Sequence, residues 1–371
     1  MAKNSERIEE AVNSPLAYWD REKGGSLERE ALPRNRRGII LFTSPEDAQG
    51  DSGEAWDSIY SSRWEDQEAR VEEEVAAVEP RWQCLHDLPY FSHLRVVTEG
   101  LSPGARALEI GCGTAETSFF LGSQYGLDVY GIDVATHAVE VAAARFDRGG
   151  LDADRLSVAV IEELPFDDDT FDLVFGKTVY EHFEDPEAAA REVARVTAAG
   201  GHLVLDVPNT RNAYWTLASE RARGHTHLTN VYRIEELCGF FMRQGFRIDQ
   251  TWGEGLLYTT PYILLSSLRR ALHRRSRAQA EAAADDSGTG APLQGIGRRL
   301  QALMGPADRL FKAGVRLVNA VSARLGLVSD KTGVLIGIVA VREPAITTTK
   351  PLFTRVNDGS RARKLLTSTA G

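Results

Sequence analysis

Hydrophobic positions between residues 101 and 252 alternate between short apolar runs and stretches with helical spacing. The apolar runs predict seven strands, at Ala105–Gly111, Asp128–Val134, Leu156–Ile161, Phe171–Thr178, Gly201–Pro208, Phe246–Trp252 and Thr332–Arg342. The helical spacing predicts helices at Trp82–Thr98, Glu116–Gln124, Thr136–Arg148, Pro186–Thr197 and Ile234–Gln244. This alternation is typical of an α/β fold with a doubly wound, mostly parallel sheet, which binds its ligand at the carboxyl ends of the strands.

The stretch from residue 105 to residue 134 carries the strongest candidate for a binding site. Gly111 and Gly113 follow the first apolar run, and without a Cβ the backbone there can turn sharply and lie against a ligand. Asp133 ends the next run, where a carboxylate can accept hydrogen bonds from both hydroxyls of a ribose. Two cofactor classes fit this spacing, NAD and S-adenosylmethionine, and the glycines alone do not separate them.

Four segments favour the second cofactor class. Residues Glu109–Ala115 read E-x-G-x-G-x-A, which resembles the first motif of the class I S-adenosylmethionine-dependent methyltransferases, whereas NAD-binding folds usually have a glycine where Glu116 stands. Residues 163–174 resemble the L-P-F-x-D-x-x-F-D segment of that family, and residues 180–186 resemble its E-H-x-x-D-P segment. Residues 333–341 resemble its antiparallel seventh strand.

The resemblance covers residues 101–252 and 332–343 and is nearest to the ubiquinone/menaquinone biosynthesis type of methyltransferase. It implies a seven-stranded, Rossmann-like methyltransferase fold with an antiparallel last strand. Residues 256–330 of this chain add a helical insertion where the plain family core has a short turn. The resemblance also implies S-adenosylmethionine as the cofactor and transfer of a methyl group to a small-molecule or lipid-linked acceptor, with oxygen as the expected target atom. An NAD(P)-dependent oxidoreductase and a non-catalytic methyltransferase-like scaffold are the alternatives.

Cofactor contacts are expected at the carboxyl ends of the first four strands. The residues assigned to them are Glu109, Gly111, Cys112, Gly113, Thr114, Asp133, Val134, Ile161, Glu162 and Lys177. The family commonly has an acidic residue that contacts the adenine amino group where this chain has Val160. The backbone of Ile161 and the side chain of Glu162 or Glu163 are expected to replace that contact.

Three histidines are candidates for a general base that removes the proton of an acceptor hydroxyl, because histidine titrates near neutral pH. His182 follows the fourth strand, where substrate must arrive, and a helix-start residue bonded to backbone is an equally good interpretation. His225 and His227 lie after the fifth strand, in a segment where the family often places substrate contacts. They could also be ordinary surface histidines, and no further ligand for a metal stands near them, so no metal site is expected.

Composition limits the cellular setting and the kind of partner. Cys84, Cys112 and Cys238 fit neither a zinc spacing nor a disulfide framework, which favours a reducing cytosol. The chain shows no signal peptide and no apolar stretch long enough to span a bilayer, so a cytoplasmic protein is expected. A net charge of −10 and the lack of a nucleic-acid motif argue against a nucleic-acid partner.

The resulting domain organisation has five parts. They are an N-terminal leader and lid at 1–67, partly disordered; a methyltransferase core at 68–255; a basic helical insertion at 256–330; the last core strand at 331–343; and a disordered tail at 344–371. Within the insertion, residues 262–325 combine apolar and arginine-rich positions, and packing on the core or on a second subunit is the favoured interpretation. Peripheral contact with an anionic membrane is the other one. The sequence does not determine the oligomeric state.

Overall fold

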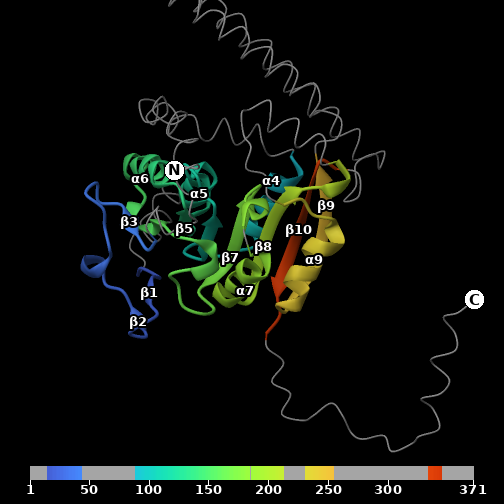
Figure 1. Cartoon of the computed structure of the whole chain (residues 1–371). Coiled ribbons are helices and arrows are strands. Elements are labelled where there is room, and N and C mark those ends of the chain that lie inside the picture. The colour runs from blue at the N-terminus through green and yellow to red at the C-terminus, as the bar shows by residue number, and fades with distance from the viewer. Residues whose placement is uncertain (1–14, 44–87, 184, 213–229, 255–332, 345–371) are drawn as a thin grey trace, which may run out of the picture.

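The computed structural model describes residues 15–43, 88–183, 185–212, 230–254 and 333–344 (Figure 1). The predicted basic insertion, almost all of the predicted tail, and residues 1–14 and 44–67 of the predicted leader and lid lie outside these residues and stay predictions. Within the described residues, no helix has both the length and the apolar character needed to cross a membrane.

One mixed sheet forms the centre of the described structure (Figure 1). Its strands, in spatial order, are β3 (Ile40–Leu41), β6 (Leu156–Val158), β5 (Asp128–Asp133), β4 (Arg106–Ile110), β7 (Phe171–Lys177), β8 (Thr197–Pro208), β10 (Leu335–Arg342) and β9 (Phe246–Glu254). Only β10 runs antiparallel to its neighbours within this sheet, which confirms the predicted doubly wound fold and its antiparallel last strand. The expected number of strands in the sheet, seven, was too small by one, because β3 pairs with β6 and extends the edge.

Helices cover both faces of this sheet. Their bounds are Pro89–Glu99 for α4, Glu116–Tyr125 for α5, Thr136–Arg148 for α6, Pro186–Val196 for α7 and Ile234–Arg243 for α9. Two separate clusters of buried side chains form the core, one beneath α4, α5 and α6 and the other beneath α7 and α9. The start of α7 is set by its sequence, since Asp185 accepts hydrogen bonds from the backbone N–H groups of Glu187 and Ala188 and Pro186 occupies the first turn.

The pleat of the strands sorts side chains between the two clusters. In β4, Ala107 packs under α4 and α5 while Leu108 packs on the opposite face. Glu109 therefore points to the same face as Ala107, where its carboxylate accepts hydrogen bonds from the N–H group (3.1 Å) and the hydroxyl (2.6 Å) of Ser118 in α5. Burial raises the pKa of Glu109 to about 8, against the lowering effect of these two bonds.

The N-terminal residues 15–43 are anchored to the sheet edge. A short hairpin, β1 (Trp19–Asp20) with β2 (Gly25–Ser26), precedes β3. Tyr18 is fully buried, stacked on Phe166 with 5.3 Å between ring centroids, and also contacts Phe42 and Tyr130. This aromatic side chain is the main apolar attachment of the segment to the core.

Replacement of Tyr18 by alanine tests this attachment. We expect Tyr18→Ala to lower the free energy of unfolding by about 3–5 kcal/mol, because a large buried ring is removed from a packed cluster. Tyr18→Phe keeps the ring stack and is expected to cost less than about 1.5 kcal/mol. Urea unfolding followed by circular dichroism measures both, and equal losses in the two variants would show that the ring stack is not what matters.

The buried carboxyl of Glu109 predicts a pH dependence of stability. Its pKa in the folded protein lies above the unfolded value, so between pH 5 and 8 the folded state keeps a proton that the unfolded chain has released. Stability conferred by this group is therefore fully present at low pH and is lost as the pH rises through that window, by at most about 1.4 kcal/mol per pH unit. We expect Glu109→Gln to flatten the decline measured by urea unfolding.

The exposed Glu99 on α4 offers a matched control, because its side chain is half exposed and pairs with Arg95. Glu99→Gln should leave the pH profile of stability as it is in the unaltered protein. A decline that is equally steep in the Glu109→Gln protein would refute the assignment.

Candidate functional site

A cavity of about 160 Å³ opens at the carboxyl ends of β4, β5, β6 and β7. It is lined by Gly111, Ile132, Asp133, Val134, Ala159, Ile161, Lys177, Thr178, Val179, His182 and Phe183. Six of the residues predicted for the site from the sequence are in this lining: Gly111, Asp133, Val134, Ile161, Lys177 and His182. The topology brings them together because parallel strands end at one edge of the sheet.

The turn after β4 has the conformation that its glycines allow. Gly111 has a φ of +63°, and a Cβ built there would collide with the side chain of Val179. Asp133 ties this turn to β5, because its carboxylate accepts hydrogen bonds from the N–H groups of Gly113 (2.8 Å) and Ala135 (2.9 Å). A carboxylate has about four acceptor positions, so Asp133 can accept further bonds from a ligand in the cavity.

The other predicted cofactor residues lie around the cavity without lining it. Glu109 is buried beneath the turn and holds the first part of α5. Cys112 is buried beside Gly131, and burial raises the pKa of its thiol well above the usual value, so it is a packing residue of the turn. Thr114 is buried, and its carbonyl oxygen accepts a hydrogen bond from Arg145. Glu162 lies half-buried in a short helical turn, Ile161–Glu163, that follows β6.

His182 reaches the cavity from a short helical turn, Tyr180–His182, after β7. Its Nε2 lies 3.9 Å from Oε1 of Glu181, whose side chain is buried. The backbone of Glu181 is held in turn, because its carbonyl oxygen accepts a hydrogen bond of 3.0 Å from the N–H group of Asn230. The other two candidate bases, His225 and His227, lie outside the described residues.

Lys177 belongs to a charged cluster that sequence reasoning missed. Its Nζ lies 2.5 Å from Oδ2 of Asp206 in β8 and 4.0 Å from Oε1 of Glu254 at the end of β9. The ammonium also lies 4.8 Å from the ring centre of Tyr90 in α4 and 5.8 Å from that of Phe91. All three charged residues lie at or near the ends of strands and point to the face covered by α4, so counting alternate positions along each predicted strand could have found them.

The charges of this cluster stabilise one another. Burial alone would lower the pKa of Lys177, but the carboxylates of Asp206 and Glu254 outweigh it and raise that pKa, so the amine stays protonated at neutral pH. Burial raises the pKa of Asp206, while Lys177 acts in the opposite direction. The second oxygen of Asp206 accepts a hydrogen bond of 2.8 Å from the N–H group of Thr178, which has the unusual φ of +48°. Asp206 therefore orders both residues at the end of β7.

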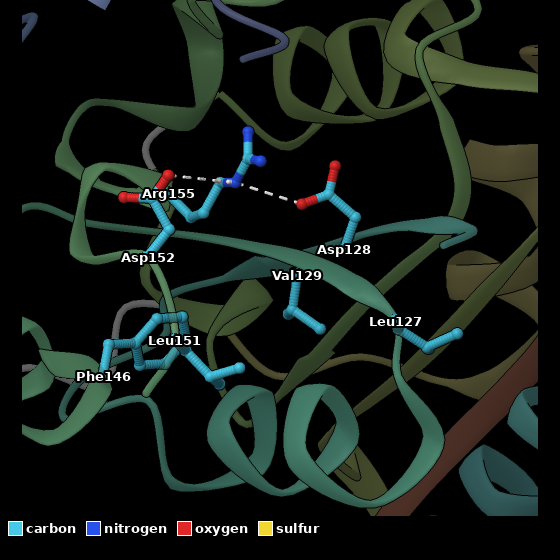
Figure 2. A pocket seen from close by; sticks show the side chains of 7 residues that line it. All are labelled: Leu127, Asp128, Val129, Phe146, Leu151, Asp152 and Arg155. Atoms are coloured by element: carbon cyan, nitrogen blue, oxygen red, sulfur yellow. Dashed lines mark ion pairs between the residues drawn. The ribbon is translucent and has the colours of Figure 1, made fainter. Parts of the chain in front are cut away.

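Figure 2 shows a second, much smaller cavity of about 10 Å³ beside the first residues of β5. Three charged side chains line it, and Arg155 points between the other two (Figure 2). Its Nε lies 3.1 Å from Oδ1 of Asp128 and 3.8 Å from Oδ2 of Asp152. The space suits about one water molecule. Asp128 starts β5 and Asp133 ends it, so this ion pair lies at the amino ends of the strands, away from the candidate site at their carboxyl ends, and supports the fold.

Comparison with known proteins identifies the family of this region. Residues 108–205, which include the glycine turn, Asp133 and Lys177, match the family described as a methyltransferase domain. The chain is 36% identical over 100 residues to norajmaline N-methyltransferase of Rauvolfia serpentina, an alignment that covers 26% of this chain and 34% of the relative. It is 30% identical over 151 residues to 27-O-demethylrifamycin SV methyltransferase of Amycolatopsis mediterranei, covering 40% of this chain and 50% of the relative.

The chain is also similar to the solved structure of the YcgJ protein from Bacillus subtilis, at 25% identity and a TM-score of 0.38, over 44% of this chain and 71% of that one. The chain spans half or less of the length of the two methyltransferases named above. The family match coincides with the strands and turns that build the cavity. The candidate site therefore lies in a segment, residues 108–205, that matches a methyltransferase domain, and S-adenosylmethionine is the cofactor of this class of domain.

Proposed function

We propose that this protein transfers the methyl group of S-adenosylmethionine to an oxygen atom of a small-molecule or lipid-linked acceptor. The observation that carries the proposal is the cavity in which Gly111, Asp133, Lys177 and His182 meet, within the residues that match the methyltransferase family. A nicotinamide cofactor fits less well, because Glu116 stands where the third glycine of its binding motif belongs.

The residues of the cavity suit a nucleoside with a positively charged side arm. Asp133 lines the cavity at the end of β5, where its carboxylate would accept hydrogen bonds from the ribose hydroxyls. Val134, Ala159 and Ile161 would form an apolar seat for the adenine ring. At Gly111 the backbone itself forms part of the wall, so the ligand can approach it closely.

Bound S-adenosylmethionine supplies a methyl group on a positively charged sulfonium, and the electron pair of the broken C–S bond returns to sulfur as the new bond to the acceptor forms. The protein has to hold the acceptor close to that methyl group, aligned and away from water, and positioning of this kind can lower the barrier by about 7–11 kcal/mol. His182 is placed to take the proton of an acceptor hydroxyl, since it lines the cavity beyond the end of β7.

Of the two methyltransferases named above, one is an N-methyltransferase and the other restores a methyl group on oxygen, so they do not decide the acceptor atom of this protein. A base and a fixed cation beside the cavity suit a hydroxyl, which must lose a proton in the reaction. Contact of residues 262–325 with an anionic membrane would bring the enzyme to a lipid-linked acceptor. That part of the proposal rests on the basic amphipathic sequence alone.

Calorimetric titration with S-adenosylmethionine tests the cofactor site. We expect Asp133→Ala to weaken binding at least about tenfold, because both the ribose contact and the bond to Gly113 are lost. Asp168→Ala serves as the control, since its side chain is 68% exposed and lies in the loop before β7, at the far edge of the sheet. Undiminished affinity in the Asp133→Ala protein, or no binding by the unaltered protein, would remove the proposed function.

Methyl-transfer assays test the acceptor atom and His182. With a carbon-13-labelled methyl donor and a panel of phenols, alcohols and amines, the chemical shift of the transferred methyl group distinguishes O-methyl from N-methyl products. We expect O-methyl products, and a decrease in kcat of about a hundredfold or more for His182→Ala at neutral pH. Methylation of amines alone would contradict oxygen as the target, and an unchanged kcat would remove His182 as the base.

A further inference from the structure

The lining of the cofactor cavity contains one fixed cation. Of the described residues that line this cavity, Lys177 is the only lysine or arginine. Its side chain is 28% exposed, whereas Asp206 is fully buried and Glu254 nearly so. Lys177 is therefore the charged residue of the cluster that lines the cavity, whereas Asp206 and Glu254 do not.

Contacts on several sides hold this ammonium in place. Asp206 accepts its hydrogen bond at 2.5 Å, and Glu254 lies at 4.0 Å. The ring faces of Tyr90 and Phe91 lie on the side of α4, at distances typical of cation–π contacts. A lysine side chain normally loses much conformational freedom on binding a ligand, and here that freedom is already restricted.

An ammonium group has three N–H donors and no acceptor. The described contacts of Lys177 include one hydrogen bond, to Asp206, and a second carboxylate at longer range. A group that meets Lys177 in the cavity must therefore offer a lone pair, and a negatively charged oxygen makes the stronger hydrogen bond. An amine acceptor is poorly suited, because its nitrogen becomes positively charged during methylation, next to a cation.

We propose that Lys177 binds the acceptor through an acidic hydroxyl group, a phenol or an enol, and holds it as its oxyanion for methylation. This inference rests on the proposed function and names its substrate class. Removal of the proton precedes transfer, and His182 is the group placed to take it. The oxyanion then forms the C–O bond while the C–S bond breaks toward sulfur, so that the acceptor becomes a neutral methyl ether.

Asp206 and Glu254 reduce the attraction between Lys177 and an oxyanion without cancelling it. Both carboxylates are almost completely buried and neither lines the cavity, whereas Lys177 does. An oxyanion that meets Lys177 from the cavity is therefore farther from either carboxylate than from the ammonium, and the Coulomb energy decreases with distance.

Binding of two matched probes tests the proposal without any need for turnover. Para-nitrophenol and para-nitroaniline have nearly the same shape. The absorbance of each compound reports its binding, and that of para-nitrophenol also reports its ionisation. With S-adenosylhomocysteine present, at a pH where the free phenol is ionised, we expect the phenolate to bind at least about tenfold more tightly than the aniline. Lys177→Met should remove most of that preference, and Lys177→Arg should keep it.

Two further variants serve as controls, one for loss of the fold and one for removal of a lysine that does not line the cavity. Lys177→Met leaves two buried carboxylates without their cation, which can destabilise the protein. The double variant Lys177→Met, Asp206→Asn removes one of those charges and keeps an oxygen that can accept the hydrogen bond from Thr178. Lys23→Met removes a lysine whose side chain is 83% exposed and should leave the binding of both probes unchanged.

The outcomes separate the two proposals. The role of Lys177 would be overturned if the unaltered protein bound the two probes equally well or did not bind the phenolate. It would also be overturned if the preference persisted both in Lys177→Met and in the double variant. Each of these results would count even if S-adenosylmethionine bound normally. Failure of the unaltered protein to bind S-adenosylmethionine in the calorimetric titration would instead overturn the proposed function. A preference that is lost with Lys177 and kept by arginine, with cofactor affinity retained, would support the inference.

Discussion

Two properties of a parallel sheet determine where the chemistry of this protein can be. Neighbouring parallel strands must end at the same edge, and the pleat sends alternate side chains to opposite faces. Glu109, Lys177, Asp206 and Glu254 all stand near the ends of strands and all point to the face beneath α4 and α5. Charged groups that are up to 145 positions apart in the sequence are thereby gathered at one rim, where burial strengthens every interaction between them.

Much of the fold could be predicted because local sequence signals agree with the tertiary structure. The expected helix Thr136–Arg148 coincides with α6, and the expected strand Asp128–Val134 exceeds β5 by one residue. Proline after a capping aspartate marks the start of α7 for the same reason. The glycine turn and Asp133 could be recognised because a tight turn of this kind restricts the residue types that fit, so the requirement is visible in the sequence itself.

Other parts of the site depend on pairing between distant segments, which no local pattern records. β3 has only two residues, too few for a strand to be recognised from its own sequence, and it pairs with β6 in a segment that also buries Tyr18. The contact of Lys177 with Asp206 requires knowledge of the register between β7 and β8, in which these two residues face each other. Lys177 was expected among the cofactor contacts, whereas the partners that fix its charge and position became visible only in three dimensions.

β9 and β10 are antiparallel neighbours in the sheet, although a long stretch of sequence stands between them. Glu254 and Leu335 are partners in the register, so the chain leaves the sheet and returns to it at one point, beside the cofactor cavity. The length of the intervening chain changes the free energy of closing such a loop only slowly. The chain between β9 and β10 can therefore change in length and sequence over evolution without altering the strands of the sheet.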